Sequence, residues 1–185
     1  MTSELKQVIQ RIRAHIEQYN VICPLGFDGA FRDPEANQIY LRKFNDNDIE
    51  QFGMADNLGN FFYLRFAETE RATFAESPRT ASCRDSVTMS IDMRAIFIYE
   101  ANDQFEVGDY LMNVMQGVEI MPFQNMSNFA LNFNSIDYDY FNWNDEDTGG
   151  IILHYMPYIK SCAIDFTVNF RRDLDICRNP PNLVP

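Results

Sequence analysis

Carboxylates are the residues of this sequence most able to do chemistry. The 65 residues between Arg94 and Lys160 contain no Lys or Arg and ten acids. These acids are Glu100, Asp103, Glu106, Asp109, Glu119, Asp137, Asp139, Asp145, Glu146 and Asp147. This acidic block carries a charge of −10, whereas the other 120 residues together carry −2. Acids at this density either stay hydrated or meet a basic partner.

Half of the acidic block falls in residues 136–150, where acids alternate with aromatic and amide side chains. Asp145, Glu146 and Asp147 could bind Ca²⁺ through their oxygens, although the spacing is not that of an EF-hand loop. Trp143 and its aromatic neighbours could stack on a sugar or lie under a neighbouring subunit. A plain turn between two strands is the simplest interpretation of this segment.

Arginine outnumbers lysine by twelve to three, and Arg is the residue that pairs with carboxylates in a planar, bidentate way. Arg71, Arg79 and Arg84 lie in a polar insertion, residues 67–86, that lacks an apolar period. We hypothesise that this insertion is an arm that lays its guanidinium groups on a neighbour's acidic block. Such head-to-tail contacts close into a ring when the rotation allows. The alternative is a mobile surface loop beside a merely solvated acidic face.

The sequence contains none of the common catalytic motifs, such as a Walker A loop, GxGxxG, HExxH or GxSxG. Its cysteines, at 23, 83, 162 and 177, form no CxxC pair and predict free thiols in a reducing cytoplasm. We therefore expect no enzyme activity, no cofactor and no metal. The net charge of −12 argues against binding to a nucleic-acid backbone. No apolar run is long enough to cross a membrane, and the N-terminus does not resemble a secretory signal.

The N-terminal part predicts one helix and two strands. Apolar residues recur at steps of three and four over residues 3–19, which predicts an amphipathic helix lying on a sheet. Its opposite, wet side should carry Lys6, Arg11, Arg13 and Glu17. Residues 24–37 predict a loop because of their Pro, Gly and Asx content, strands are expected at 38–44 and 60–66, and residues 45–59 predict a turn.

The remainder predicts a long strand, a helix and further strands. Residues 87–99 alternate clearly, and both faces become apolar from Ile96, which places this strand near the centre of a sheet. A helix follows at 104–116, with Asp103 as N-cap and Gly117 at its end. Strands are expected within 129–141, 151–159 and 161–176, before a C-terminal tail, 178–185. The sequence thus predicts a single α+β domain over 1–185, with an antiparallel or mixed sheet and helices on one side.

In size and element order the chain resembles ring-forming neck (head–tail connector) and tail-terminator proteins of tailed bacteriophages. The matching elements are the N-terminal helix SELKQVIQRIRAHI, two early strands, the strand SVTMSIDMRAIFIY running into the helix NDQFEVGDYLMNVM, and the late pair ILHYMPYI and CAIDFTVNF. The resemblance implies a non-enzymatic virion subunit, assembled in the host cytoplasm into a homo-oligomeric ring. Other virion proteins would be its partners, and DNA would pass through without specific binding.

Two other functions fit the same sequence. An acidic binding or inhibitor protein that mimics nucleic acid would share the charge asymmetry, but it would be a monomer or dimer. A small metal- or carbohydrate-binding protein could be built on residues 136–147.

Overall fold

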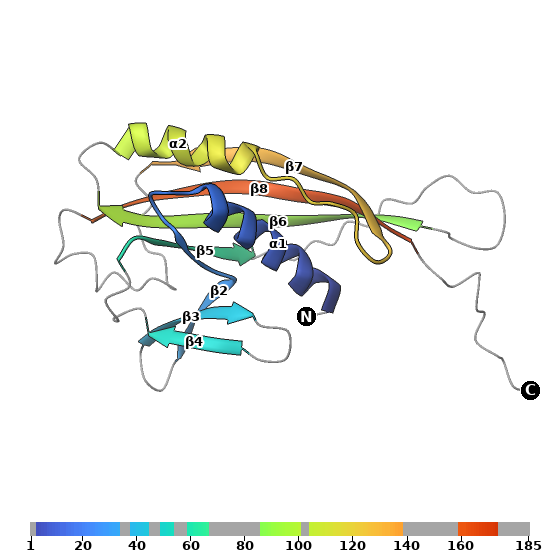
Figure 1. The fold of residues 1–185 in the computed structure, drawn as a ribbon, viewed down its shortest axis with the longest axis horizontal. Coiled ribbons are helices and arrows are strands. Elements are labelled where there is room, and N and C mark those ends of the chain that lie inside the picture. Colours follow the sequence, from blue (N-terminus) through green and yellow to red (C-terminus); the bar gives the residue numbers. More distant parts are fainter. Residues whose placement is uncertain are drawn as a thin grey trace, which may run out of the picture.

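The computed structural model describes residues 3–33, 38–44, 49–53, 59–66, 86–100, 104–138 and 159–173. These residues form an α+β fold with a mixed sheet, as the sequence predicts (Figure 1). The elements are α1 (Ser3–Tyr19), β1 (Leu25–Phe27), β2 (Gly29–Asp33), β3 (Gln38–Phe44), β4 (Ile49–Gly53), β5 (Phe61–Phe66), β6 (Ser86–Glu100), α2 (Gln104–Gln116), β7 (Met126–Asp137) and β8 (Ile159–Asp173). The polar insertion apart from Ser86, residues 151–158 of the strand predicted at 151–159, and the C-terminal tail lie outside the described residues.

Among these elements, the main sheet has five strands in the order β1-β5-β6-β8-β7. Only the short β1 runs parallel to its neighbour, β5, and the other pairings in this sheet are antiparallel. The strand β6 lies between β5 and β8, which confirms the central position expected from its two apolar faces. Its register with β8 is unbroken from Ser86, opposite Asp173, to Glu100, opposite Ile159.

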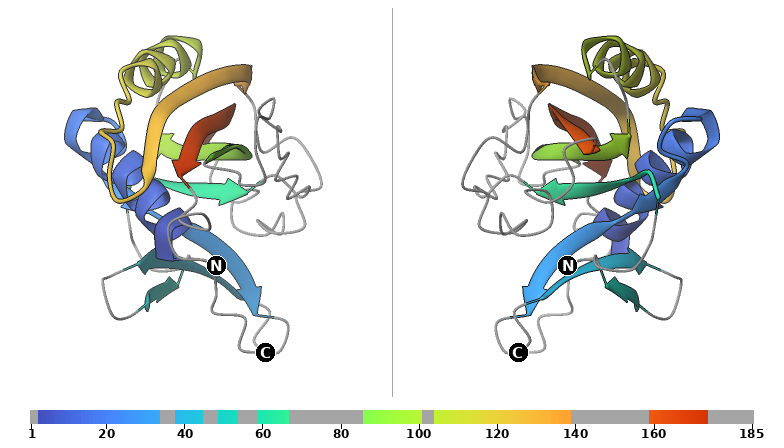
Figure 2. Two further views of the ribbon diagram at one scale, coloured as in Figure 1. Left: turned by 90° about the vertical axis from the view of Figure 1, so that its right-hand side faces the viewer. Right: turned by 90° about the vertical axis from the view of Figure 1, so that its left-hand side faces the viewer.

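Both described helices cover the same face of the main sheet (Figure 2). The apolar stripe of α1 and the inner side of α2 pack on alternate residues of β5, β6 and β8, as expected for amphipathic helices on a sheet. Val8, Ile12, Leu111, Met115 and Phe97 are all fully buried in this core. The limits of α1 and α2 are those predicted from their periodicity.

A second core lies on the opposite face of the main sheet, under a sheet that the sequence analysis missed. The strands β2, β3 and β4 form an antiparallel sheet, and Leu41 packs with Phe27 against Tyr63 and Ile96 of the main sheet. Burial on this side explains why β6 becomes apolar on both faces from Ile96 onward.

Two predictions about this region were wrong. Residues 24–37 were expected to form a loop but contain β1 and β2, and residues 45–59 were expected to form a turn but contain β4. The cause is that these strands are only three to five residues long. They are stabilised by pairing: β1 pairs with β5, which is distant in sequence, whereas β2 and β4 pair with β3, the strand between them.

Candidate subunit interface

The ends of the β6–β8 strand pair carry different charges. Glu100 and Ser86 lie at its opposite ends, and at about 3.3 Å per residue they are about 46 Å apart. This distance is several times the Debye length of about 8 Å at physiological ionic strength. Exposed charges at the two ends therefore do not influence each other within one molecule.

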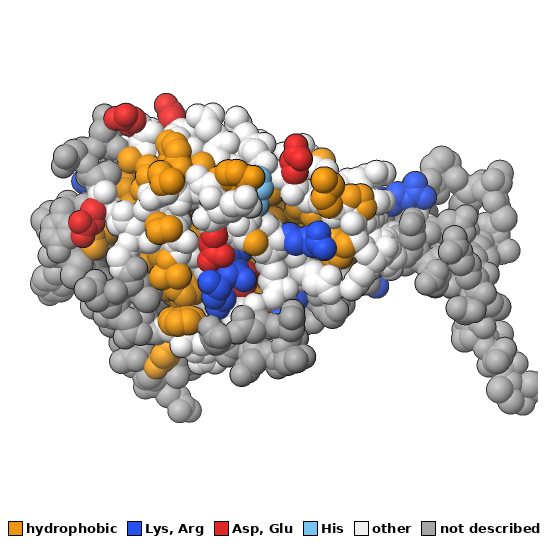
Figure 3. Space-filling model, viewed as in Figure 1, with side chains coloured by type: hydrophobic (Ala, Val, Ile, Leu, Met, Phe, Trp, Pro, Cys, Tyr) orange, Lys and Arg blue, Asp and Glu red, His pale blue; other side chains and the backbone are white. Residues whose placement is uncertain are grey.

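Four members of the acidic block lie at the end where β6 and β7 finish and α2 begins. They are Glu100, Glu106, Asp109 and Asp137, all exposed. Figure 3 shows acidic side chains over this end of the molecule, at the left of the view. One lysine, Lys160, is also located here, because it pairs with Tyr99 in the register of β6 and β8. We call this region the acidic end.

Aromatic residues hold part of the acidic end in place. The Tyr138 hydroxyl donates a hydrogen bond of 2.8 Å to Asp109 Oδ1, and this bond raises the pKa of the Tyr138 phenol. The Phe105 ring lies 5.2 Å from the Tyr138 ring, centroid to centroid, although Phe105 is 60% exposed. Gly108 permits this packing, since a Cβ there would come within 2.5 Å of the Tyr138 ring.

Arginines lie at the opposite end of the strand pair, which we call the arginine end. Arg171 and Arg172 occur in the last residues of β8, followed by one acid, Asp173, opposite Ser86, and Arg171 is exposed. The polar insertion connects β5 to β6, and one of its two described flanking positions lies at this end. It starts after Phe66, which lies opposite Met93, and it leads into Ser86 at the end of the pair.

The remaining residues proposed from sequence lie outside the described residues. These are Arg71, Arg79 and Arg84 of the insertion, and Asp103, Asp139, Asp145, Glu146 and Asp147 of the acidic block. Glu119, the tenth acid, is exposed after α2 and away from the acidic end. Within the described ranges, no group of three or more His, Cys, Asp and Glu side chains is placed to hold a metal ion.

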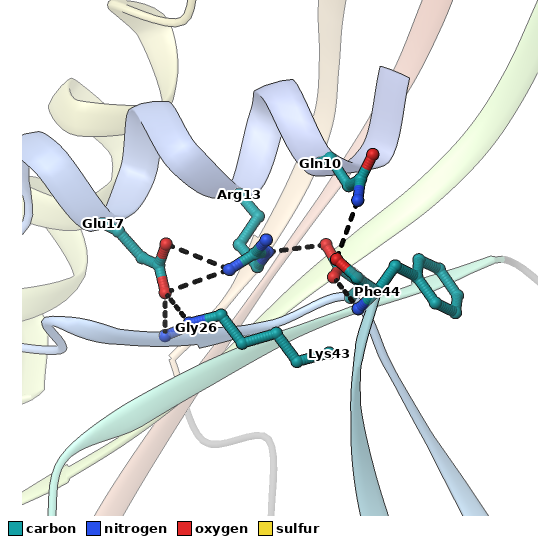
Figure 4. A network of polar contacts seen from close by, with 7 residues as sticks. Gln10, Arg13, Glu17, Gly26, Lys43 and Phe44 are labelled. Carbon is teal, nitrogen blue, oxygen red and sulfur yellow. Dashed lines mark hydrogen bonds and ion pairs between the residues drawn. The ribbon is translucent and has the colours of Figure 1, made fainter. Parts of the chain in front are cut away.

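Arg13 was predicted on the wet side of α1, and this prediction was wrong. Its Nε donates to Asp28 Oδ1 at 2.7 Å, and the Asp28 side chain is completely buried. Arg13 Nη1 also pairs with Glu17 at 3.2 Å, and Glu17 in turn accepts from Lys43 Nζ at 3.0 Å. Figure 4 shows this network at the place where α1 crosses β1 and β3. The small sheet wraps the flank of α1 and so buries a residue that the helix alone would expose.

Backbone groups complete the network. The amide of Gly26 donates to Glu17 at 3.0 Å, and the amide of Phe44 donates to Asp28 Oδ2 at 2.6 Å. Burial raises the pKa of Asp28, although the hydrogen bond from the Phe44 amide and the charge of Arg13 act to lower it. The network ties α1 to both sheets, so we assign it a structural role.

Polar side chains cross three strands on the uncovered half of the main sheet, opposite the helices. Arg94 makes a bidentate pair with Asp165, at 2.6 and 3.0 Å, and Ser135 donates to the same carboxylate at 2.8 Å. In the adjacent row Thr167 donates to Asp92 at 2.6 Å and accepts from Asn134 at 3.1 Å. These hydrogen bonds pair the polar side chains with one another across β6, β8 and β7, so we assign them a structural role.

Comparison with known proteins gives no relative: no family model, no curated protein and no solved structure matches this chain. In the part of the chain that the structure describes, no helix is long and apolar enough to cross a membrane.

Proposed function

We propose that this protein is a non-enzymatic structural subunit of a bacteriophage virion that assembles into a homo-oligomeric ring. The ring would lie at the head–tail junction or at the tail end, and DNA would pass through it. The supporting observation is the separation of Glu100 at the acidic end from Arg171, opposite Thr88 at the arginine end, by about 40 Å along one strand pair.

Charges separated in this way favour head-to-tail contact between copies. A two-fold contact centred on one end of this molecule would bring like charges together there, because it uses the same patch on both subunits. A head-to-tail contact instead places carboxylates against arginines, and it generates a ring when the rotation closes. The element order that resembles ring-forming phage proteins supports the same arrangement.

The acidic block has a second use in this proposal. Carboxylates that line a channel repel phosphates, so they would keep passing DNA from binding to the wall. We propose that the block is divided between the channel and the contact between subunits. Placement of residues 100–147 on the outer rim of a solved oligomer, away from both, would contradict this division.

Light scattering coupled to size-exclusion chromatography tests the ring. We expect a mass that is a multiple of 21.6 kDa and falls as salt is raised, because salt screens exposed ion pairs. A monomer or dimer with no salt response would instead favour an acidic protein that mimics nucleic acid.

Replacing Arg71, Arg79 and Arg84 together by Ala separates assembly from folding. Exposed charges contribute about 0–1 kcal/mol to folding, whereas desolvated interfacial pairs contribute several-fold more to binding. We therefore expect a larger loss of self-association than of monomer stability. Equal losses would count against the arm.

A further inference from the structure

The acidic end contains a carboxylate flanked by two aromatic rings, a combination suited to one particular cation. Asp109 is exposed on α2, and one of its oxygens already accepts a hydrogen bond from Tyr138. The ring of Phe105, 60% exposed, lies beside Tyr138. An aromatic ring attracts a cation to its face through its quadrupole.

A guanidinium group matches these three side chains. It is planar, it stacks on aromatic faces, and it presents paired N–H donors to a carboxylate. A carboxylate accepts about four hydrogen bonds, so the single bond from Tyr138 leaves Asp109 able to accept more. That bond also fixes the orientation of the Asp109 carboxylate before any partner arrives, which lowers the entropy lost on binding.

We infer that Phe105, Asp109 and Tyr138 form a binding site for an arginine of the polar insertion, residues 67–86, of a second copy of this chain. This inference rests on the proposed ring and names its contact. The occupant follows from charge complementarity, and the proposed head-to-tail contact brings the insertion of a second copy to this end. Its two attachment points lie about 23 Å and about 46 Å from Glu100 along the strands, toward the arginine end. The insertion contains Arg71, Arg79 and Arg84.

The experiment measures self-association by sedimentation equilibrium for Phe105→Ala and Asp109→Asn. Matched controls are Met121→Ala, which removes another exposed apolar side chain (69% exposed), and Glu119→Gln, which removes another exposed acid. We expect each site variant to weaken association about tenfold or more, because a stacked, desolvated ion pair is lost, and each control to change it less than about twofold. Thermal unfolding of each variant verifies that it folds.

A charge reversal identifies the partner residue. Asp109→Arg should abolish assembly, and one of Arg71→Asp, Arg79→Asp or Arg84→Asp should restore it when combined with Asp109→Arg. Failure of every combination to restore assembly would overturn the inference.

The remaining outcomes separate this inference from the proposed function. If the wild-type chain assembles and the site variants assemble equally well, the arginine site is wrong and the ring stands. If the wild-type chain remains at 21.6 kDa at all concentrations, the ring itself is wrong, and the site falls with it.

Discussion

Replacing Arg13 by methionine tests whether the buried ion pair under α1 holds the two sheets together. Methionine retains an apolar stem but leaves the fully buried carboxylate of Asp28 with the Phe44 amide as its remaining donor among the described residues. Removing one partner of a buried pair costs about 3–5 kcal/mol. At about 2–4 °C per kcal/mol for a chain of this size, the melting temperature should fall by about 10 °C.

The assay is urea unfolding followed by circular dichroism at a protein concentration below assembly. The control is Arg11→Met, on the same helix, where the exposed guanidinium lies 4.1 Å from the centre of the Phe123 ring. Loss of that contact should cost about 0.5–1 kcal/mol. Our reasoning is refuted if Arg13→Met is no more destabilising than Arg11→Met.

The pH dependence of Arg13→Met gives a second check. Burial raises the pKa of Asp28 in the folded protein above its pKa in the unfolded chain, so the folded state binds the proton more tightly. Stability therefore falls as pH rises through the interval between these two pKa values. Loss of Arg13 should raise this pKa further. The destabilisation should therefore shrink as pH is lowered from 7 toward 4, where Asp28 can become protonated. A destabilisation by Arg13→Met that does not change with pH would contradict a buried, charged Asp28.

Three further predictions concern packing, thiols and surface charge. Gly26→Ala should destabilise the fold by about 1–3 kcal/mol in urea unfolding, because a Cβ would lie 2.4 Å from the buried ring of Phe62, whereas Gly29→Ala should be near neutral. Cys23 and Cys162 should resist thiol reagents in the native state, because burial raises the pKa of Cys162 to about 12 and that of Cys23 further; fast labelling of a variant that keeps only these two cysteines would contradict this. Burial acts to raise the pKa of Asp165, but hydrogen bonds from Arg94 and Ser135 outweigh it and lower the pKa in the folded protein. The contribution of Asp165 to stability should therefore be lost as pH falls below its pKa in the unfolded chain. Asp165→Asn should make the free energy of unfolding less dependent on pH in that range.

Local patterns were sufficient to predict the long elements of this fold. The apolar period of α1, the alternation of β6 and the end of α2 at Gly117 are each properties of a continuous stretch of sequence. The amide of Gly117 bonds back to Asn113 and Val114, as expected at a helix end. These elements therefore appeared with nearly the predicted limits.

The small sheet could not be predicted in the same way, because β2 and β4 are only five residues long and show little periodicity of their own. They are stabilised by pairing with β3 and by packing of this sheet against the main sheet. The burial of Arg13 is a consequence of that sheet. Arg13 lies at the flank of the apolar stripe of α1, between Ile9 and Ile16 on the helix surface, where the sequence pattern does not decide between water and protein. It is covered by Gly26 of β1 and by Asp28, which the amide of Phe44 in β3 holds in place.

The charge layout was visible in the sequence, but its geometry was not. A stretch without Lys or Arg predicts an acidic surface wherever it folds. The topology adds that β6, α2 and β7 bring four of the ten acids to one end of the molecule. It also adds that β6, which follows the insertion, begins at Ser86 at the other end.

Electron microscopy of the assembled wild-type protein tests the central claim most directly, because it shows which end of one copy touches which end of the next. We predict a closed ring in which the Glu100 end of each subunit contacts the insertion of its neighbour. Particles with two-fold symmetry that join like ends, or single unassembled chains, would contradict the account.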